Sequence, residues 1–252
     1  MEKYKISIVS YYNTLPFIYG IDNSDYIIEN SVIEKDYPAK CAAKLLENEV
    51  DIGLVPVAVL PQIKGYKILT DYCLSTNGKV QTVLLVSQVS LKDIKRVYLD
   101  YQSLTSINLV KILAKHFWKI KPEWLSTEKG YEAKIENSDG GIIIGDRAFG
   151  INGEFKFCYD LGEEWKKVTN LPFVFAVWAA NKEIDNKYVK ELNSAFKLGY
   201  KNIDKVVLNA VGKIEIPTIR LKKYLTENID FVLDENKKRS MNLYLELLEQ
   251  NK

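Results

Sequence analysis

The sequence contains very little histidine and cysteine. Its 252 residues include one histidine, His116, and three cysteines, Cys41, Cys73 and Cys158. The cysteines lie far apart, are odd in number and form no C-x-x-C pair, so neither a disulfide framework nor a zinc site is expected. We expect reduced thiols, as in a cytosolic protein.

Long apolar runs and a strong charge of one sign are also missing. The 35 Lys and Arg residues nearly balance the 33 Asp and Glu residues, and they alternate along the chain instead of clustering as in nucleic-acid-binding proteins. No run of about 18 apolar residues occurs, and the N-terminus leads directly into an alternating strand without the apolar core of a signal peptide. We expect a soluble cytoplasmic protein that binds neither nucleic acid nor membrane; its oligomeric state stays open.

The sequence does contain a regular alternation of strands and helices. The expected elements of the first part are a strand over residues 5–11, a helix starting at Thr14, a strand over 26–33, a helix over 38–47 and a strand over 51–55. This alternation is typical of parallel sheets in an α/β fold.

The same pattern starts again near residue 91, after a long extended region. The extended region covers 66–75 and 80–86, and the Asn77-Gly78 dipeptide between them favours a hairpin-like reversal. The repeat is expected to contain a strand over 96–100, helices over 105–118 and near 131, and a strand over 141–144. An apolar run at 173–180 predicts a buried strand, and only helices are expected after it, over 185–200, near 203, over 217–226 and over 235–249.

Two α/β units separated by two long apolar strands predict a two-lobed molecule. We interpret the chain as an α/β type II periplasmic-binding-protein-like fold with two interlobe crossover strands. Lobe one is predicted to contain residues 1–88 and 178–252, and lobe two residues 89–177. Ligands of such folds bind in the cleft between the lobes.

Five stretches of the first 180 or so residues carry a family resemblance. They are SYYNTLPF (10–17), DIGLVPVA (51–58), SLTS (103–106), IGDRA (144–148) and LPFVFAVW (171–178). In order and spacing they resemble the chorismate dehydratases of the futalosine route to menaquinone, which have a type II periplasmic-binding-protein fold. There are two departures: Leu104 stands where the family has arginine, and Thr82 stands where it has serine.

The resemblance implies a cytoplasmic lyase that removes water from chorismate to give 3-[(1-carboxyvinyl)oxy]benzoate. The C4 hydroxyl and the C3 hydrogen leave and the ring becomes aromatic, so neither a cofactor nor a metal is required. The sequence agrees with this, because it contains no glycine-rich nucleotide loop and no cluster of metal ligands.

Three hydroxyl side chains at one strand–helix junction are candidates for binding the substrate carboxylates. Ser103, Thr105 and Ser106 follow the strand that ends near residue 100. The free N–H groups and the dipole of a helix start favour an anion there. Alternatively, Thr105 or Ser106 serves only as a helix cap.

Asn13 and Thr82 are the candidate catalytic residues. Asn13 follows the first strand, where its amide either orients the leaving hydroxyl or holds the enolpyruvyl carboxylate; the alternative is an Asx turn. Thr82 enters the crossover, where it either donates a hydrogen bond to the substrate or simply reflects the preference of threonine for strands.

Three further residues are weaker candidates for substrate binding. Asp146 either caps a short helix and pairs with Arg147 or contributes a carboxylate to the cleft. Arg147 either neutralises the substrate or forms an outward ion pair that stabilises little. Phe175, near the second crossover, is a candidate for stacking on the ring.

His116 is not a candidate for acid–base catalysis. It shares a helix face with Leu109, Ile112 and Leu113, about three turns from the hydroxyl cluster. The enolpyruvyl carboxylate of the substrate is therefore the hypothetical base that takes the C3 proton.

Other functions also fit this fold. The sister lyase that forms 1,4-dihydroxy-6-naphthoate uses a histidine in the second lobe, and a non-catalytic small-anion binding protein would normally carry a signal peptide. The effector lobe of a transcriptional regulator would require an appended DNA-binding segment. Mixing the protein with chorismate distinguishes an enzyme from a binder.

Overall fold

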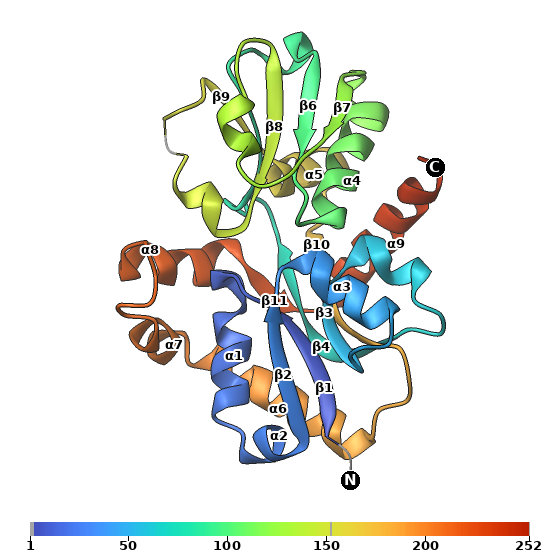
Figure 1. Cartoon of the computed structure of the whole chain (residues 1–252), viewed down its shortest axis with the longest axis vertical. Coiled ribbons are helices and arrows are strands. Elements are labelled where there is room, and N and C mark those ends of the chain that lie inside the picture. The colour runs from blue at the N-terminus through green and yellow to red at the C-terminus, as the bar shows by residue number, and fades with distance from the viewer. Residues whose placement is uncertain (1–2, 152, 252) are drawn as a thin grey trace.

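The molecule has two lobes, each built on a mixed β-sheet, as the computed structural model of residues 3–151 and 153–251 shows (Figure 1). The first sheet has six strands, which in spatial order are β11 (Asp230–Val232), β4 (Lys67–Thr76), β10 (Phe173–Ala180), β3 (Ile52–Pro56), β1 (Tyr4–Val9) and β2 (Ser31–Asp36). The second has five, which are β7 (Glu123–Ser126), β6 (Arg96–Leu99), β8 (Asp139–Ile144), β5 (Val83–Ser87) and β9 (Phe157–Asp160). The predicted α/β fold with two lobes is confirmed.

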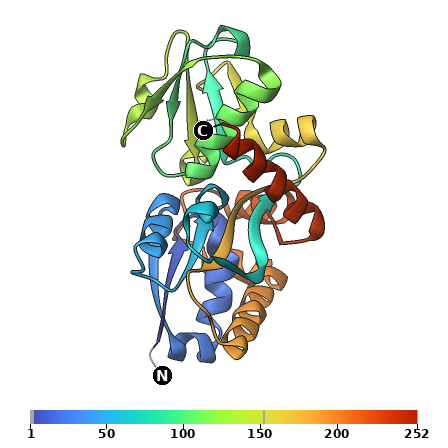
Figure 2. The ribbon, with the colours of Figure 1, turned by 90° about the vertical axis from the view of Figure 1, so that its right-hand side faces the viewer.

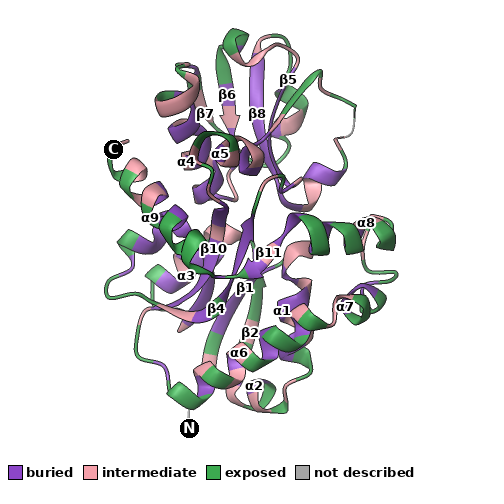
Figure 3. Ribbon diagram, turned by 180° about the vertical axis from the view of Figure 1, so that it is seen from behind, coloured by how far each residue is buried: buried purple, intermediate pink, exposed green. Residues whose placement is uncertain are grey.

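Strand pairing differs between the two sides of the first sheet, which is parallel on the side of β1 and antiparallel on the side of β4. β1 is parallel to β2 and β3, whereas β10 runs antiparallel to both β3 and β4. All five residues of β3 are buried, and so are seven of the eight in β10. Figure 3 shows β8 and β10 almost entirely in the colour of buried residues. This explains why these strands appear as apolar runs in the sequence instead of alternating.

Helices surround both sheets. Those that pack around the first sheet are α1 (Leu15–Asp22), α2 (Asp25–Asn30), α3 (Pro38–Leu46), α6 (Asn186–Lys201), α7 (Ile203–Asn209) and α8 (Thr218–Lys223). Those of the second lobe are α4 (Leu104–Ile112), which continues into the helical turn η4 (Leu113–Trp118), and α5 (Leu161–Thr169).

The C-terminal helix α9 (Glu235–Glu249) connects the lobes. It packs against β10 of the first sheet and α4 of the second lobe. At its end, Lys115 Nζ donates a hydrogen bond of 2.8 Å to the carbonyl of Gln250. Figure 2 shows α9 rising from the first lobe to the side of the second. Among residues 3–151 and 153–251, no helix combines the length and the apolar character needed to cross a membrane.

The chain passes between the two sheets twice. It leaves the first sheet after Thr76, at the end of β4, and joins the second at Val83. The predicted hairpin at Asn77-Gly78 is therefore wrong: β4 pairs with β10 and β11, whereas β5 pairs with β8 and β9. The chain returns to the first sheet at Phe173, after α5. In both places the chain changes sheets several residues before the predicted lobe boundaries at 88/89 and 177/178. The division into lobes that act as separate units stays a proposal.

Three other expected elements differ from the structure. A strand is expected over residues 26–33, but Ser24 caps α2 by accepting from Ile27 N at 3.4 Å, and β2 begins only at Ser31. The helix expected near Tyr131 is a single 3₁₀ turn, Tyr131–Lys134. The strand β11 follows β10 in the sequence, where only helices are expected, and it pairs along the edge of β4.

Candidate functional site

A cavity between the two lobes contains polar side chains from both of them. It encloses about 50 Å³, measured as the volume open to the centres of water molecules. The polar side chains of its lining are Tyr11, Asn13, Thr82, Ser103 and Ser106. Much of the remaining lining is apolar and includes Val9, Leu74, Ile144 and Phe175. A few polar groups in an apolar wall are typical of small-molecule sites.

Five of the eight residues predicted from the sequence line this cavity, namely Asn13, Thr82, Ser103, Ser106 and Phe175. They lie together because the turn after β1, the segment before β5, the start of α4 and the first half of β10 all meet between the lobes. The other three lie outside the lining. The roles assigned to all eight stay predictions.

The start of α4 places two hydroxyl groups at the cavity. Ser103 is the N-cap: its Oγ accepts from Ser106 N at 3.2 Å and lies 2.9 Å from Ser106 Oγ. Ser103 therefore both caps α4 and lines the cavity. Two hydroxyl groups and the first turn of a nine-residue helix form one face of the cavity.

Thr105 faces the first lobe instead. Its Oγ1 accepts a hydrogen bond of 3.2 Å from Ala58 N, and its carbonyl accepts one of 3.1 Å from the hydroxyl of Tyr244. The side chain is fully buried. Thr105 thus holds α4 against the first lobe.

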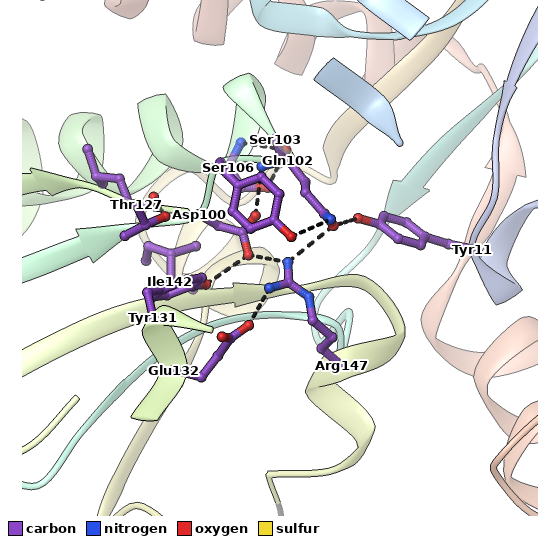
Figure 4. A network of polar contacts seen from close by, with 12 residues as sticks. Tyr11, Asp100, Gln102, Ser103, Ser106, Thr127, Tyr131, Glu132, Ile142 and Arg147 are labelled. Carbon is purple, nitrogen blue, oxygen red and sulfur yellow. Dashed lines mark hydrogen bonds and ion pairs between the residues drawn. The ribbon is translucent and has the colours of Figure 1, made fainter. Parts of the chain in front are cut away.

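Arg147 lies in a network of polar contacts beside the cavity (Figure 4). Its guanidinium forms ion pairs with Asp100, at 2.5 Å, and with Glu132, and it donates to Gln102 Oε1 at 3.2 Å. Burial raises the pKa of Asp100, while the positive charge of Arg147 lowers it. The charge of Arg147 is therefore shared between two carboxylates of its own lobe.

Tyr11 closes one side of the cavity from the first lobe. Its hydroxyl donates to Gln102 Oε1 of the second lobe (Figure 4). The backbone carbonyl of Gln102 also accepts a hydrogen bond of 3.0 Å from Ala39 N, at the start of α3. Gln102 therefore receives two hydrogen bonds from the opposite lobe.

Asn13 carries an acceptor that has no partner. Its Oδ1 is buried, and no described residue donates to it. Thr82, by contrast, is paired: its Oγ1 lies 2.8 Å from the hydroxyl of Tyr224. Because an unpaired buried acceptor costs stability, the Asn13 amide is the most unusual polar group of the lining.

From the sequence, Asp146 is expected either to cap a helix and pair with Arg147 or to contribute a carboxylate to the cleft. The structure shows a different contact. The Asp146 carboxylate accepts from Tyr12 N, at 3.0 Å for Oδ1 and 3.3 Å for Oδ2, across the gap between the lobes. Burial raises its pKa to about 7, the Tyr12 N–H lowers it, and the charge of Glu215 raises it. Asp146 lines an outer groove of about 300 Å³ together with Lys35 and Lys213.

His116 lies in η4, outside the lining of the cavity, and its buried Nε2 has no partner among the described residues. Within residues 3–151 and 153–251, no three His, Cys, Asp or Glu side chains are grouped so as to hold a metal ion.

Sequence reasoning missed three residues near the cavity: Tyr11, Gln102 and Tyr224. Tyr11 was within reach of prediction, because it belongs to the SYYNTLPF motif beside Asn13. Gln102 directly precedes the SLTS motif. Tyr224 lies in the helical C-terminal part of the chain, where no motif marks it.

Comparisons with known proteins agree with this architecture. A family model described as menaquinone biosynthesis matches residues 4–250. The chorismate dehydratase of Thermus thermophilus is 27% identical over 269 aligned positions, which cover 98% of this chain and 96% of that protein. A structure from Archaeoglobus fulgidus is similar with a TM-score of 0.78 at 13% identity, covering 98% of this chain and 97% of the other. A Candida albicans protein described as having the generic periplasmic binding protein fold gives a TM-score of 0.68 at 12% identity, covering 100% and 94%. The periplasmic-binding-protein-like fold is confirmed.

Proposed function

Because this chain belongs to the menaquinone biosynthesis family, we propose that it is a chorismate dehydratase of the futalosine route and acts in the cytoplasm. It eliminates water from chorismate to give 3-[(1-carboxyvinyl)oxy]benzoate, which makes it a carbon–oxygen lyase. The Thermus thermophilus relative is named for the same activity. Aromatisation of the ring supplies much of the driving force, so the task of the protein is to bind and orient the substrate.

The observation that carries this proposal is the unpaired Asn13 Oδ1 in the cavity wall. A buried acceptor without a partner is costly unless a ligand supplies the donor. The hydroxyl that leaves chorismate is such a donor. Asn13 therefore orients this hydroxyl and does not act as a base.

The substrate carboxylates require donors on the opposite face. Ser103, Ser106 and the N–H groups at the start of α4 supply them. The cavity lining contains no Lys or Arg side chain among the described residues, and Leu104 stands where the family has arginine. Neutral donors and the helix dipole thus bind the dianion, with Phe175 against its ring.

The cavity must widen to admit chorismate. Sites that hold ligands of drug size measure about 300–1,000 Å³, compared with about 50 Å³ here. We assign this structure to the closed form, in which the contacts of Tyr11 with Gln102 and of Tyr12 with Asp146 hold the lobes together. Separation of the lobes would break these contacts.

The base in this proposal is the enolpyruvyl carboxylate of the substrate, which takes the C3 proton. Asn13→Ala should lower turnover at least about 100-fold with little change in melting temperature. Asn228→Ala is the matched control, because its Oδ1 is also buried and unpaired among the described residues but Asn228 lies outside the lining.

A chorismate analogue that lacks the enolpyruvyl carboxylate tests the base directly. We expect it not to aromatise even at saturation, which separates lost chemistry from lost binding. Turnover of the analogue at a near-normal rate would mean that the protein supplies the base.

A further inference from the structure

Tyr224 lies behind the two candidate catalytic side chains without lining the cavity itself. It begins the helical turn η7 (Tyr224–Asn228) in the C-terminal part of the chain, and 1% of it is exposed. Its hydroxyl lies 2.8 Å from Thr82 Oγ1. The ring of Phe149 packs edge-on against its own ring, with centroids 5.1 Å apart at an interplanar angle of 90°. Tyr224 is therefore fixed in position from two sides.

The hydroxyl of Tyr224 stays protonated and forms its hydrogen bond with Thr82. Among residues 3–151 and 153–251, the Tyr224 hydroxyl has one side-chain hydrogen-bond partner, Thr82 Oγ1. Asn13 lies close enough to lower the pKa of Tyr224, and its own Oδ1 is left without a donor. Burial raises the pKa of Tyr224, and the neighbouring Thr82 and Asn13 side chains lower it; the net shift is upward, so the phenol keeps its proton.

Because a buried phenol proton without an acceptor is costly, Tyr224 donates it to Thr82 Oγ1, which leaves the proton of Thr82 free. A protein acceptor for this proton is the Val80 carbonyl. Its oxygen lies 3.5 Å from Thr82 Oγ1, which is long for a hydrogen bond donated by a hydroxyl to an oxygen. Thr82 lines the cavity, as Asn13 does. The cavity wall therefore presents an acceptor, Asn13 Oδ1, together with a donor, the Thr82 hydroxyl.

We propose that Tyr224 is a positioning residue that orients the Thr82 hydroxyl so that it forms, with Asn13 Oδ1, a donor–acceptor pair for one hydroxyl group of the ligand. A hydroxyl is the group that donates to one partner and accepts from another at the same atom. Resting on the function proposed above, this hydroxyl is the C4 hydroxyl that leaves chorismate.

The arrangement stabilises the leaving oxygen more as the reaction advances. As the C4–O bond breaks, the oxygen takes the bonding pair and gains negative charge, which strengthens the hydrogen bond from Thr82. The electrons of the C3–H bond form the new ring double bond. The C3 proton passes through the enolpyruvyl carboxylate to the departing oxygen, which leaves as water.

Tyr224→Phe tests this role, because it removes only the hydroxyl. We expect kcat to fall about 10- to 100-fold and KM to stay within about threefold. Inhibition by the product should be unchanged, since the product lacks the C4 hydroxyl. Thr82→Val should cause a similar loss, the double variant should lose nothing further, and Thr82→Ser should keep most of the activity.

Tyr188→Phe is the matched control. Tyr188 is also buried, and its hydroxyl is hydrogen-bonded to the hydroxyl of Ser31 within the first lobe. It should lose a similar amount of stability and no activity. Independent losses that multiply in the Tyr224–Thr82 double variant, or product inhibition that weakens as much as kcat falls, would overturn the proposal.

Failure of the proposed function would be recognised separately, because wild-type protein would then leave chorismate unchanged. The inference would in that case be tested by binding of 4-hydroxycyclohexanecarboxylate and cyclohexanecarboxylate. Wild type should prefer the hydroxylated ligand about tenfold or more, and Tyr224→Phe should not. Equal affinity of wild type for both ligands would overturn the inference.

Discussion

Gly145, in the second lobe, leaves the space into which the Tyr11 ring of the first lobe packs. A Cβ atom at Gly145 would lie 2.7 Å from a ring carbon of Tyr11. Gly145 also has a φ of +65°, and its N–H donates to the Thr82 carbonyl at 2.9 Å. This glycine thus allows the two lobes to approach each other at the cavity, whose lining includes both Gly145 and Tyr11.

Gly145→Ala should therefore destabilise the closed form in two ways: the alanine must adopt a left-handed backbone conformation, and its Cβ clashes with the Tyr11 ring. A left-handed alanine costs about 1–2 kcal/mol, and the clash adds to this. Gly65→Ala is the control, since Gly65 has a φ of +66° and a Cβ added there would meet no described atom within 4 Å. Urea unfolding should show a larger loss for Gly145→Ala, and Tyr11→Ala should remove the excess. Equal losses for the two glycine variants would contradict the packing argument.

Asp146 should make stability depend on pH. Burial raises its pKa from 3.8 to about 7, although the hydrogen bond from the Tyr12 N–H lowers the pKa. The folded protein therefore holds a proton that the unfolded chain releases at lower pH. Stability from this group is present below about pH 4 and is lost as the pH rises to about 7. The charged groups that face it are Glu215 and, along the outer groove, Asp22, Lys35 and Lys213.

Asp146→Asn isolates this effect, because the amide oxygen still accepts from Tyr12 N. Relative to wild type, the variant should gain on the order of 1–4 kcal/mol between pH 4 and pH 8, as measured by denaturant unfolding across this range. Parallel stability profiles would show that the carboxylate ionises normally.

Ser103 and Ser106 should separate capping from substrate binding. Ser103→Ala removes both the N-cap of α4 and a cavity hydroxyl, so it should cost about 1 kcal/mol of stability and also weaken substrate binding. Ser106→Ala keeps the capping bond to its N–H but removes a cavity hydroxyl, so substrate affinity should fall by about 1–3 kcal/mol. Melting and product binding are measured for both variants. An unchanged affinity in Ser106→Ala would restrict this serine to a structural role.

His116→Ala should retain turnover within about threefold. The histidine lies in η4, outside the lining of the cavity, and no proton transfer is assigned to it. Steady-state kinetics with a folding control measure this. A loss greater than about 100-fold in a folded variant would identify an acid–base catalyst that the account lacks.

The sequence predicts this site better than it predicts strand pairing. Asn13, Thr82, Ser103 and Ser106 were identifiable because the family resemblance marks their positions, and because they stand at strand and helix ends that meet at the cavity. The partners of β4 and β5 were not identifiable, because a Gly-containing turn fits a hairpin and a crossover equally well in local conformation. Arg147 shows the same limit: only tertiary structure places it between Asp100 and Glu132.

The measurement that tests the account most directly is the fate of chorismate mixed with the purified protein. Ring absorbance and the mass of the product are followed over time at saturating substrate. We predict conversion to 3-[(1-carboxyvinyl)oxy]benzoate with release of water, without any added cofactor. Chorismate that is bound by folded protein and recovered unchanged would contradict it and would assign the chain to the binding proteins of this fold.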